Sequence, residues 1–131
     1  MEKGIFAMAD FKIERLNTII IPVKNLKKSI HFYENVLHLL KGYVDESMAY
    51  FTFGTSHDHT TILLHIIDQP EPVEKGIVIE LLVDDLTSAV SSIKEAGGLI
   101  IQEPINREWG VIEAIIADPD GYKVWLVQSI E

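Results

Sequence analysis

The chain carries the same sequence pattern twice, sixty positions apart. Residues 19–26 read IIIPVKNL and residues 79–86 read IELLVDDL, and each copy leads from an apolar, strand-like stretch into an amphipathic one. Asn25 and Asp85 stand at the two junctions, and both are of the residue types that cap helix N-termini. A repeat of this kind predicts two similar modules that face each other across a shared groove.

The spacing of apolar residues predicts one helix after each cap. Apolar side chains recur every three or four residues, which places them on one helix face. We expect Gly42 to end the first helix and the pair Gly97-Gly98 to end the second. The residues on the two apolar faces are Leu26, Ile30, Tyr33, Leu37 and Leu40 in the first helix, and Leu86, Val90 and Ile93 in the second.

Eight stretches of strand length accompany the two helices. Pro104 to Gly110, which includes Trp109, is predicted to be a loop, and Asp118-Pro119-Asp120-Gly121 is predicted to be a tight hairpin turn. The predicted order is βαβββ twice, an α+β fold, with strands near residues 17–23, 43–45, 49–53, 61–67, 77–83, 99–102, 111–117 and 122–128.

The length of 131 residues fits one compact body made of two fused half-domains. We expect an N-terminal extension over residues 1–13 and a first module over residues 14–69. A linker over residues 70–75, which contains two prolines, leads to a second module over residues 76–131.

Composition excludes several classes of function. The 20 acidic and 11 basic residues give a net charge of −9, which disfavours binding to nucleic acid because phosphates require cations. The absence of cysteine rules out disulfides and thiolate metal sites and favours a cytoplasmic protein. No apolar run approaches the roughly 20 residues of a membrane span, so no membrane association is expected.

Side chains alternate across each strand, so every strand has two faces. One face is almost uniformly aliphatic and is expected to pack against the helices: Ile19, Ile21, Val23, Ile62, Leu64, Ile66, Ile77, Ile79, Leu81, Val83, Tyr122, Val124 and Leu126. The other face mixes apolar and polar residues: Thr18, Ile20, Pro22, Thr61, Leu63, His65, Ile67, Val78, Glu80, Leu82, Lys123, Trp125 and Val127. Such a mixed face suits either a ligand site or a second core covered by a partner chain or by the other module.

Several of these segments resemble the two modules of the vicinal oxygen chelate superfamily. The matching segments are residues 23–33 (VKNLKKSIHFY) with Leu37, residues 83–86 (VDDL), Gly97-Gly98, Trp109-Gly110 and residues 118–122 (DPDGY). The superfamily includes glyoxalase I, extradiol dioxygenases, fosfomycin resistance proteins and bleomycin-binding proteins. The resemblance covers about residues 15–129. It implies two βαβββ modules that form an incomplete eight-stranded barrel around a groove, usually within a homodimer.

Enzymes of this superfamily hold a divalent metal in the groove through His, Glu or Gln on the first and last strands of each module. Matching by position places these ligands on Thr18, His65, Val78 and Trp125, which form two pairs separated by sixty positions. Valine and tryptophan offer no donor atom and a threonine hydroxyl is a poor ligand, so these residues lead us to expect neither a metal nor another cofactor. A shift in register would make Glu80 an alternative ligand beside His65.

Seven residues of the mixed face and its loops are candidates for binding an organic ligand: Thr18, His65, Val78, Glu80, Trp109, Lys123 and Trp125. His65 is either a hydrogen-bonding or acid–base group of the groove, or a core histidine. Glu80 requires a partner if it is buried, either Lys123 or a cationic ligand. Trp125 and Trp109 offer flat surfaces for stacking, although Trp109 is equally well explained as a loop anchor.

The sequence therefore predicts a protein that binds a small organic molecule without a metal, for sequestration or for sensing. One alternative is a lyase or dioxygenase-like enzyme that uses unconventional metal ligands, or a metal-free isomerase that uses His65 and Glu80. A second alternative is a structural or regulatory subunit whose groove is filled by its own side chains.

Overall fold

The computed structural model describes residues 16–55, 59–72 and 76–130. The predicted N-terminal extension, residues 1–13, and residues 73–75 of the predicted linker lie outside the described residues. Neither α-helix of the described chain is long and apolar enough to cross a membrane.

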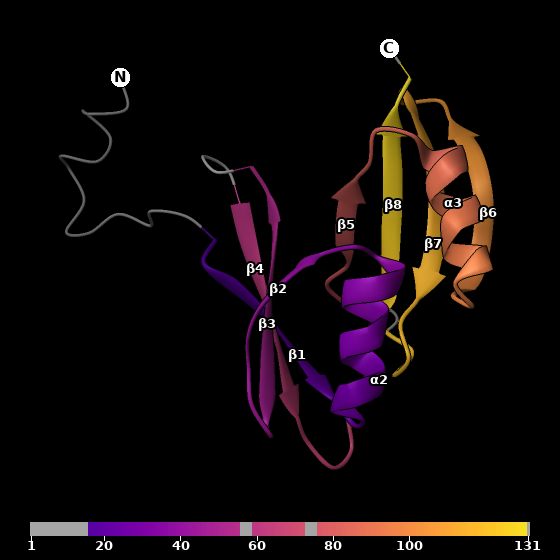
Figure 1. Cartoon of the computed structure of the whole chain (residues 1–131). Helices are drawn as coiled ribbons and strands as arrows, with labels where there is room; N and C mark the ends of the chain where they lie inside the picture. Colours follow the sequence, from indigo (N-terminus) through magenta and orange to yellow (C-terminus); the bar gives the residue numbers. More distant parts are fainter. Residues whose placement is uncertain (1–15, 56–58, 73–75, 131) are drawn as a thin grey trace, which may run out of the picture.

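The first module is a four-stranded sheet with one helical segment (Figure 1). Its strand order is β1-β4-β3-β2, and β1 runs parallel to β4. The helix α2 continues directly into a π-helical segment, η1. The elements are β1 (Thr18–Val23), α2 (Leu26–His31), η1 (Phe32–Val36), β2 (Leu40–Val44), β3 (Met48–Gly54) and β4 (His59–Ile66).

The second module repeats this arrangement with the strand order β5-β8-β7-β6. Its elements are β5 (Ile79–Leu82), α3 (Leu86–Glu95), β6 (Leu99–Arg107), β7 (Val111–Ala117) and β8 (Lys123–Ser129). The predicted α+β class and the two βαβββ modules are confirmed. The strands form two separate four-stranded sheets, so the described residues of one chain contain no closed barrel (Figure 1).

The two polar residues at the repeat junctions cap their helices as predicted. The Asn25 side chain accepts a hydrogen bond from the backbone N–H of Lys28 at 3.1 Å, and the Asp85 side chain accepts one from Ser88 at 3.1 Å. Each bond satisfies one of the N–H groups that a helix N-terminus leaves without a partner.

The prediction that the first helix ends at Gly42 is wrong. The helical segment ends at Val36, and Gly42 lies within β2. His38 has a φ of 62°, the left-handed conformation that usually belongs to glycine at a helix end. The N–H of Leu39 bonds the carbonyl of Tyr33 at 2.9 Å, which closes the helix without a glycine and explains why the stop was missed.

The predicted loop from Pro104 to Gly110 is also wrong over its first half. β6 continues to Arg107, and its register against β7 shifts between Gln102 and Ile105. This irregularity contains Pro104 at the edge of the sheet, where a residue without an N–H is tolerated. Trp109 lies in the short turn that follows.

The aliphatic face predicted from strand alternation forms the core. Ile21, Val23, Ile62 and Leu64 of the first sheet and Val124 and Leu126 of the second are buried in one cluster with residues of both helices. Two residues depart from this prediction, because Ile66 at the end of β4 and Ile77 ahead of β5 are exposed.

The two modules are joined by hydrogen bonds between α2–η1 and the predicted turn before β8. The Tyr33 hydroxyl donates to Asp118 Oδ2 at 2.8 Å, and the Ser29 hydroxyl donates to Asp120 Oδ2 at 3.4 Å. Asp120 Oδ1 also accepts from the backbone N–H of Lys24 at 3.1 Å. The turn forms as predicted, with Gly121 at a φ of 95°.

Both side chains of the Tyr33–Asp118 pair are buried, and burial shifts the pKa of each. Burial raises the pKa of Asp118, while hydrogen bonds from Tyr33 and from the N–H groups of Tyr122 and Asp120 partly offset that rise. Burial and the nearby Asp118 carboxylate raise the pKa of Tyr33 well above its ordinary value. Tyr33 therefore remains a donor at physiological pH.

Candidate functional site

The mixed faces predicted from the sequence lie on the side of each sheet away from the helices. We call these the open faces; they carry residues 18, 20, 22, 61, 63 and 65 in the first module and 78, 80, 82, 123, 125 and 127 in the second. Several apolar side chains on them are strongly exposed, with Ile20 at 61% and Leu82 at 75%. Exposed apolar side chains on the uncovered face of a sheet are candidates for an interaction or ligand surface.

Strand register changes one correspondence between the two modules that the sixty-residue repeat predicts. Ile20 and Glu80 are related by the sixty-residue repeat, and their direct strand partners are Leu63 and Trp125, which are 62 positions apart. By strand register Leu63 is therefore the counterpart of Trp125, and His65, which pairs with Pro22, is the counterpart of Val127, which pairs with Leu82. The modules differ in the lengths of their intervening strands and turns, so one fixed offset does not hold along the whole chain.

The positions that the resemblance implies for metal ligands carry Thr18, His65, Val78 and Trp125, and strand register offers Leu63 in place of His65. Val78, Trp125 and Leu63 have no donor atom for a divalent cation, Thr18 has a neutral hydroxyl, and His65 alone is a good ligand type. Among the described residues, no group of three or more His, Cys, Asp or Glu is placed to hold a metal ion. The residues present do not fit the metal centre that the superfamily implies.

His65 and Glu80 are not brought together within one chain. His65 pairs with Pro22 and Met48 in the first sheet, whereas Glu80 pairs with Trp125 in the second. Both side chains are exposed, so His65 is not a core histidine and Glu80 has no burial cost to offset. The salt bridges shown for the described residues join Lys41 to Glu34, Lys94 to Glu103 and Arg107 to Glu113.

The open face of the second sheet contains one continuous row across three strands. Glu80 lies opposite Trp125, which lies opposite Ile115 on β7. Lys123 is exposed on the same face, two residues before Trp125. The row combines a half-buried aromatic surface with a carboxylate, and it is the part of the open face that most resembles a ligand-binding surface.

Trp109 is separate from this row, in the turn between β6 and β7. Its side chain is 67% exposed, and the Arg107 guanidinium carbon lies 5.7 Å from the centre of its ring. The indole is therefore not buried as a loop anchor, and it stacks with a cation on its own module.

A buried carboxylate on the open face was missed by sequence analysis. Glu113 is only 3% exposed, and its Oε1 accepts hydrogen bonds from Arg107 Nε at 3.1 Å and Nη2 at 2.8 Å. Gln102 also approaches the same oxygen at 3.4 Å. The sequence could have indicated this residue, because Glu113 is the one charged residue in the apolar run 111–117 and lies on the same strand face as Ile115.

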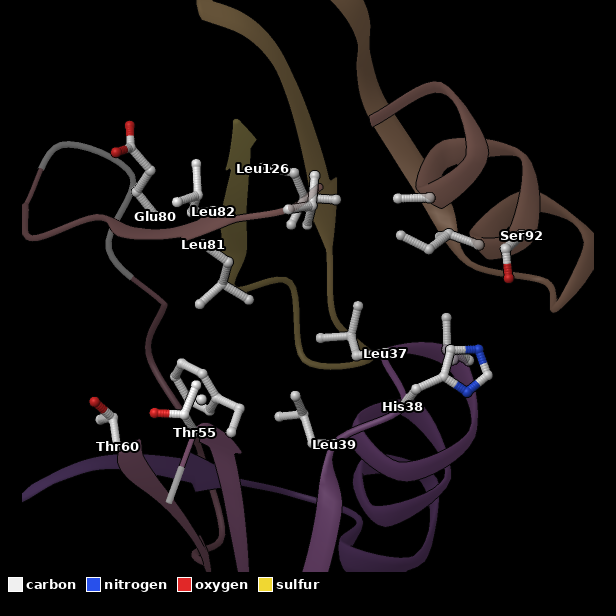
Figure 2. A pocket seen from close by; sticks show the side chains of 16 residues that line it. Leu37, His38, Leu39, Thr55, Thr60, Glu80, Leu81, Leu82, Ser92 and Leu126 are labelled. Atoms are coloured by element: carbon white, nitrogen blue, oxygen red, sulfur yellow. The ribbon is translucent and has the colours of Figure 1, made fainter. Parts of the chain in front are cut away.

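A cavity of about 570 Å³ lies between the two modules, on the helix side of β5 (Figure 2). Of the seven residues predicted to bind a ligand, only Glu80 borders it. Figure 2 shows Leu81 pointing into the cavity, toward Leu37 and Leu39, while Glu80 and Leu82 point away from it. The cavity and the open face of the second module therefore lie on opposite sides of β5.

Comparison with known proteins points to one superfamily. Residues 15–126 match the model of the Glyoxalase/Bleomycin resistance protein/Dioxygenase superfamily. A lactoylglutathione lyase from Neisseria meningitidis is 33% identical over 126 residues, covering 88% of this chain and 91% of the relative. One from Escherichia coli O157:H7 is 30% identical over 126 residues, covering 88% of this chain and 93% of the relative.

Solved structures share the fold at lower identity. A superfamily member from Sphaerobacter thermophilus has a TM-score of 0.71 at 24% identity, covering 89% of this chain and 98% of that one. TnmS3, an antibiotic binding protein from Streptomyces, has a TM-score of 0.71 at 22% identity, covering 91% of this chain and 98% of that one.

Proposed function

The chain belongs to the glyoxalase/bleomycin resistance protein/dioxygenase superfamily, and from that premise we propose that it binds a small organic molecule on its open faces without a metal ion. The observation that carries the proposal is the donor set at the four positions where the superfamily holds its metal. Thr18, Val78 and Trp125 stand at three of these positions, and the fourth is His65 by the resemblance or Leu63 by strand register. At most one of these side chains is a good ligand for a divalent ion.

A second copy of the chain is part of the proposed site. The helix-side surfaces of both sheets contribute to one core within one chain, which leaves the open faces uncovered. β1 and β2 are the edges of the first sheet, and β5 and β6 are the edges of the second. A twofold dimer would place the open face of one first module against that of the other chain's second module, which creates two identical grooves. The exposed Ile20 and Leu82 supply apolar surface that such an interface would bury.

The side chains on the open faces indicate the chemistry of the ligand. Trp125 offers a ring for stacking, and Glu80 offers an exposed carboxylate beside it. The ligand expected from this pairing has a flat or apolar body with a hydrogen-bond donor or a positive charge. The net charge of −9 favours the approach of such a molecule.

Thermal unfolding in the presence of a panel of small metabolites and antibiotics tests the proposal. A compound that binds the folded state at 100 times its Kd stabilises the protein by about 2.7 kcal/mol. We expect the resulting shift in Tm to persist in EDTA and to be lost in Trp125→Ala. A shift that requires added Zn²⁺ or Ni²⁺ would overturn the metal-free proposal.

The role of the second copy is tested by adding a charge at two exposed positions. Leu82→Glu places a carboxylate on the open face, and we expect it to make the protein monomeric and to abolish ligand binding. Thr87→Glu adds the same charge on the exposed side of α3 and serves as the matched control. Sedimentation velocity measures the oligomeric state of both variants. The same oligomeric state in the two variants would contradict the proposed interface.

The similarity to lactoylglutathione lyases supports an enzyme as the competing function. Turnover of a glyoxal–glutathione adduct that is lost in His65→Ala or in Glu80→Gln would favour that enzyme over the binding protein. The donor set and the separation of His65 from Glu80 lead us to expect no turnover above the uncatalysed rate.

A further inference from the structure

We infer that the cavity between the modules is a second binding site, distinct from the open faces, for an uncharged and largely apolar small molecule. Its volume of about 570 Å³ falls within the range of about 300–1,000 Å³ that is usual for small-molecule sites. The open face of the second module lies on the other side of β5 from this cavity, and Glu80 and Leu82 border both (Figure 2).

The walls of the cavity come from both modules. The first contributes Leu37 and Leu39, between η1 and β2, and Phe53 at the end of β3. The second contributes Leu81 on β5 and Ile93 on α3. Leu37, Leu39, Phe53 and Leu81 are only partly buried, although they pack against the core. A ligand of matching shape would remove their remaining apolar surface from water.

The geometry of His38 contributes to the shape of this site. Its left-handed backbone ends the helical segment and lets the flanking Leu37 and Leu39 both line the cavity. A non-glycine residue in this conformation carries a backbone cost that the surrounding structure must offset. The hydrogen bond between Leu39 and Tyr33 holds the turn in place.

The polar lining indicates a neutral ligand. The acidic residue that borders the cavity, Glu80, points away from it in Figure 2. The polar side chains that remain include the hydroxyls of Thr60 and Ser92 and the imidazole of His38, which suit one or two hydrogen bonds to a carbonyl or hydroxyl group. The described residues of the lining include no lysine or arginine, so an anionic group would be desolvated there without an opposing charge.

Fluorescence titration with N-phenyl-1-naphthylamine, a neutral apolar probe, tests the inference. We expect saturable binding to the wild-type chain. Ala89→Phe places a ring into the cavity from α3 and should weaken binding about tenfold or more. Ser91→Phe adds the same ring on the exposed side of α3, away from the cavity, and should leave the affinity within about twofold.

Two further variants control for misfolding and for binding of the probe to the open face. Thr60→Phe fills the cavity from β4 and should weaken binding like Ala89→Phe, even if one of the two variants is poorly folded by circular dichroism. Trp125→Ala removes the proposed open-face ligand site and should leave probe binding unchanged, so this inference and the proposed function fail separately. Absence of saturable binding to wild type, unchanged affinity in both cavity variants, or loss in Trp125→Ala would overturn the inference.

Discussion

The hydroxyl of Tyr33 donates a 2.8 Å hydrogen bond to the Asp118 carboxylate and thereby joins the helical segment of the first module to the turn before β8 in the second. Tyr33 is fully enclosed and Asp118 is 5% exposed. Asp118 Oδ1 is occupied by the N–H groups of Asp120 and Tyr122 at 3.0 and 2.9 Å, so Tyr33 is the partner of the other oxygen. This bond holds together the two modules that enclose the cavity.

Tyr33→Phe should destabilise the chain by about 1–3 kcal/mol, because it leaves a buried carboxylate oxygen without its donor while keeping the ring. Urea unfolding monitored by circular dichroism measures the change. Tyr43→Phe is the matched control, because it removes a hydroxyl that bonds Asp45 on the exposed surface. A smaller loss in Tyr33→Phe than in Tyr43→Phe would contradict the structural role of the junction.

The same variant should show a characteristic dependence on pH. Burial raises the pKa of Asp118 in the folded state above its ordinary value of 3.8. The carboxyl group therefore contributes its full stability below pH 3.8, where it is protonated in both the folded and the unfolded chain. That contribution is lost as the pH rises through the folded-state pKa. The bond from Tyr33 lowers that pKa, and its removal should raise it further. The destabilisation by Tyr33→Phe should therefore grow from acidic to neutral pH. A pH-independent difference in free energy of unfolding would contradict this assignment.

Removing the cap of the first helix should cost about 1 kcal/mol. Asn25→Ala loses the acceptor for the Lys28 N–H, whereas Asn25→Ser keeps a side-chain oxygen at the same position. Urea midpoints of the two variants check this prediction. Equal stabilities of the alanine and serine variants would show that the capping bond contributes nothing.

Gly98→Ala should destabilise the chain by about 1–3 kcal/mol through overpacking. A Cβ atom at this position would lie 2.5 Å from Ile93 Cγ2, 3.0 Å from the Ile93 carbonyl oxygen and 3.3 Å from Val36 Cγ1. At Gly42 the nearest atoms would be 3.7 and 3.9 Å away, so Gly42→Ala is the control and should be close to neutral. Thermal unfolding of both variants measures the difference; comparable losses would contradict the close approach of η1 to the end of α3.

Replacing only Arg107 of the Arg107–Glu113 ion pair should destabilise the chain more than replacing both residues. Arg107→Leu leaves the buried Glu113 without its cation and should cost about 2 kcal/mol, a value reduced because Arg107 is about one-third exposed. The double variant Arg107→Leu with Glu113→Leu should recover part of that loss. Urea unfolding of the single and double variants measures the coupling energy between Arg107 and Glu113. A double variant less stable than Arg107→Leu would show that the unpaired Glu113 carboxylate does not cause the loss of stability.

The sequence alone allowed much of the fold to be predicted, because the features involved are local. Asn25 and Asp85 cap helices as expected, and the strand alternation correctly assigned Ile21, Leu64 and Val124 to the core. The end of the first helix was missed because His38 adopts a conformation that its residue type does not announce. The length of β6 was underestimated because Pro104 sits within an edge-strand irregularity.

The candidate site was harder to predict because it depends on pairing between distant strands. The sixty-residue repeat is correct for Ile20 and Glu80, yet their partners Leu63 and Trp125 are 62 positions apart. That difference of two residues makes Leu63, and not His65, the register counterpart of Trp125. The Arg107–Glu113 pair and the cavity between the modules arise from tertiary packing, which no single segment of the sequence specifies.

The metal content of the untagged protein decides whether this chain binds its ligand without a metal ion. The chain is purified without chelator, incubated with Zn²⁺ and Ni²⁺, desalted and analysed by inductively coupled plasma mass spectrometry. With at most one good ligand among Thr18, His65, Val78 and Trp125, we expect far less than one retained divalent ion per chain. Retention of one ion per chain, lost on substitution of His65 or Glu80, would show that the chain has a metal site.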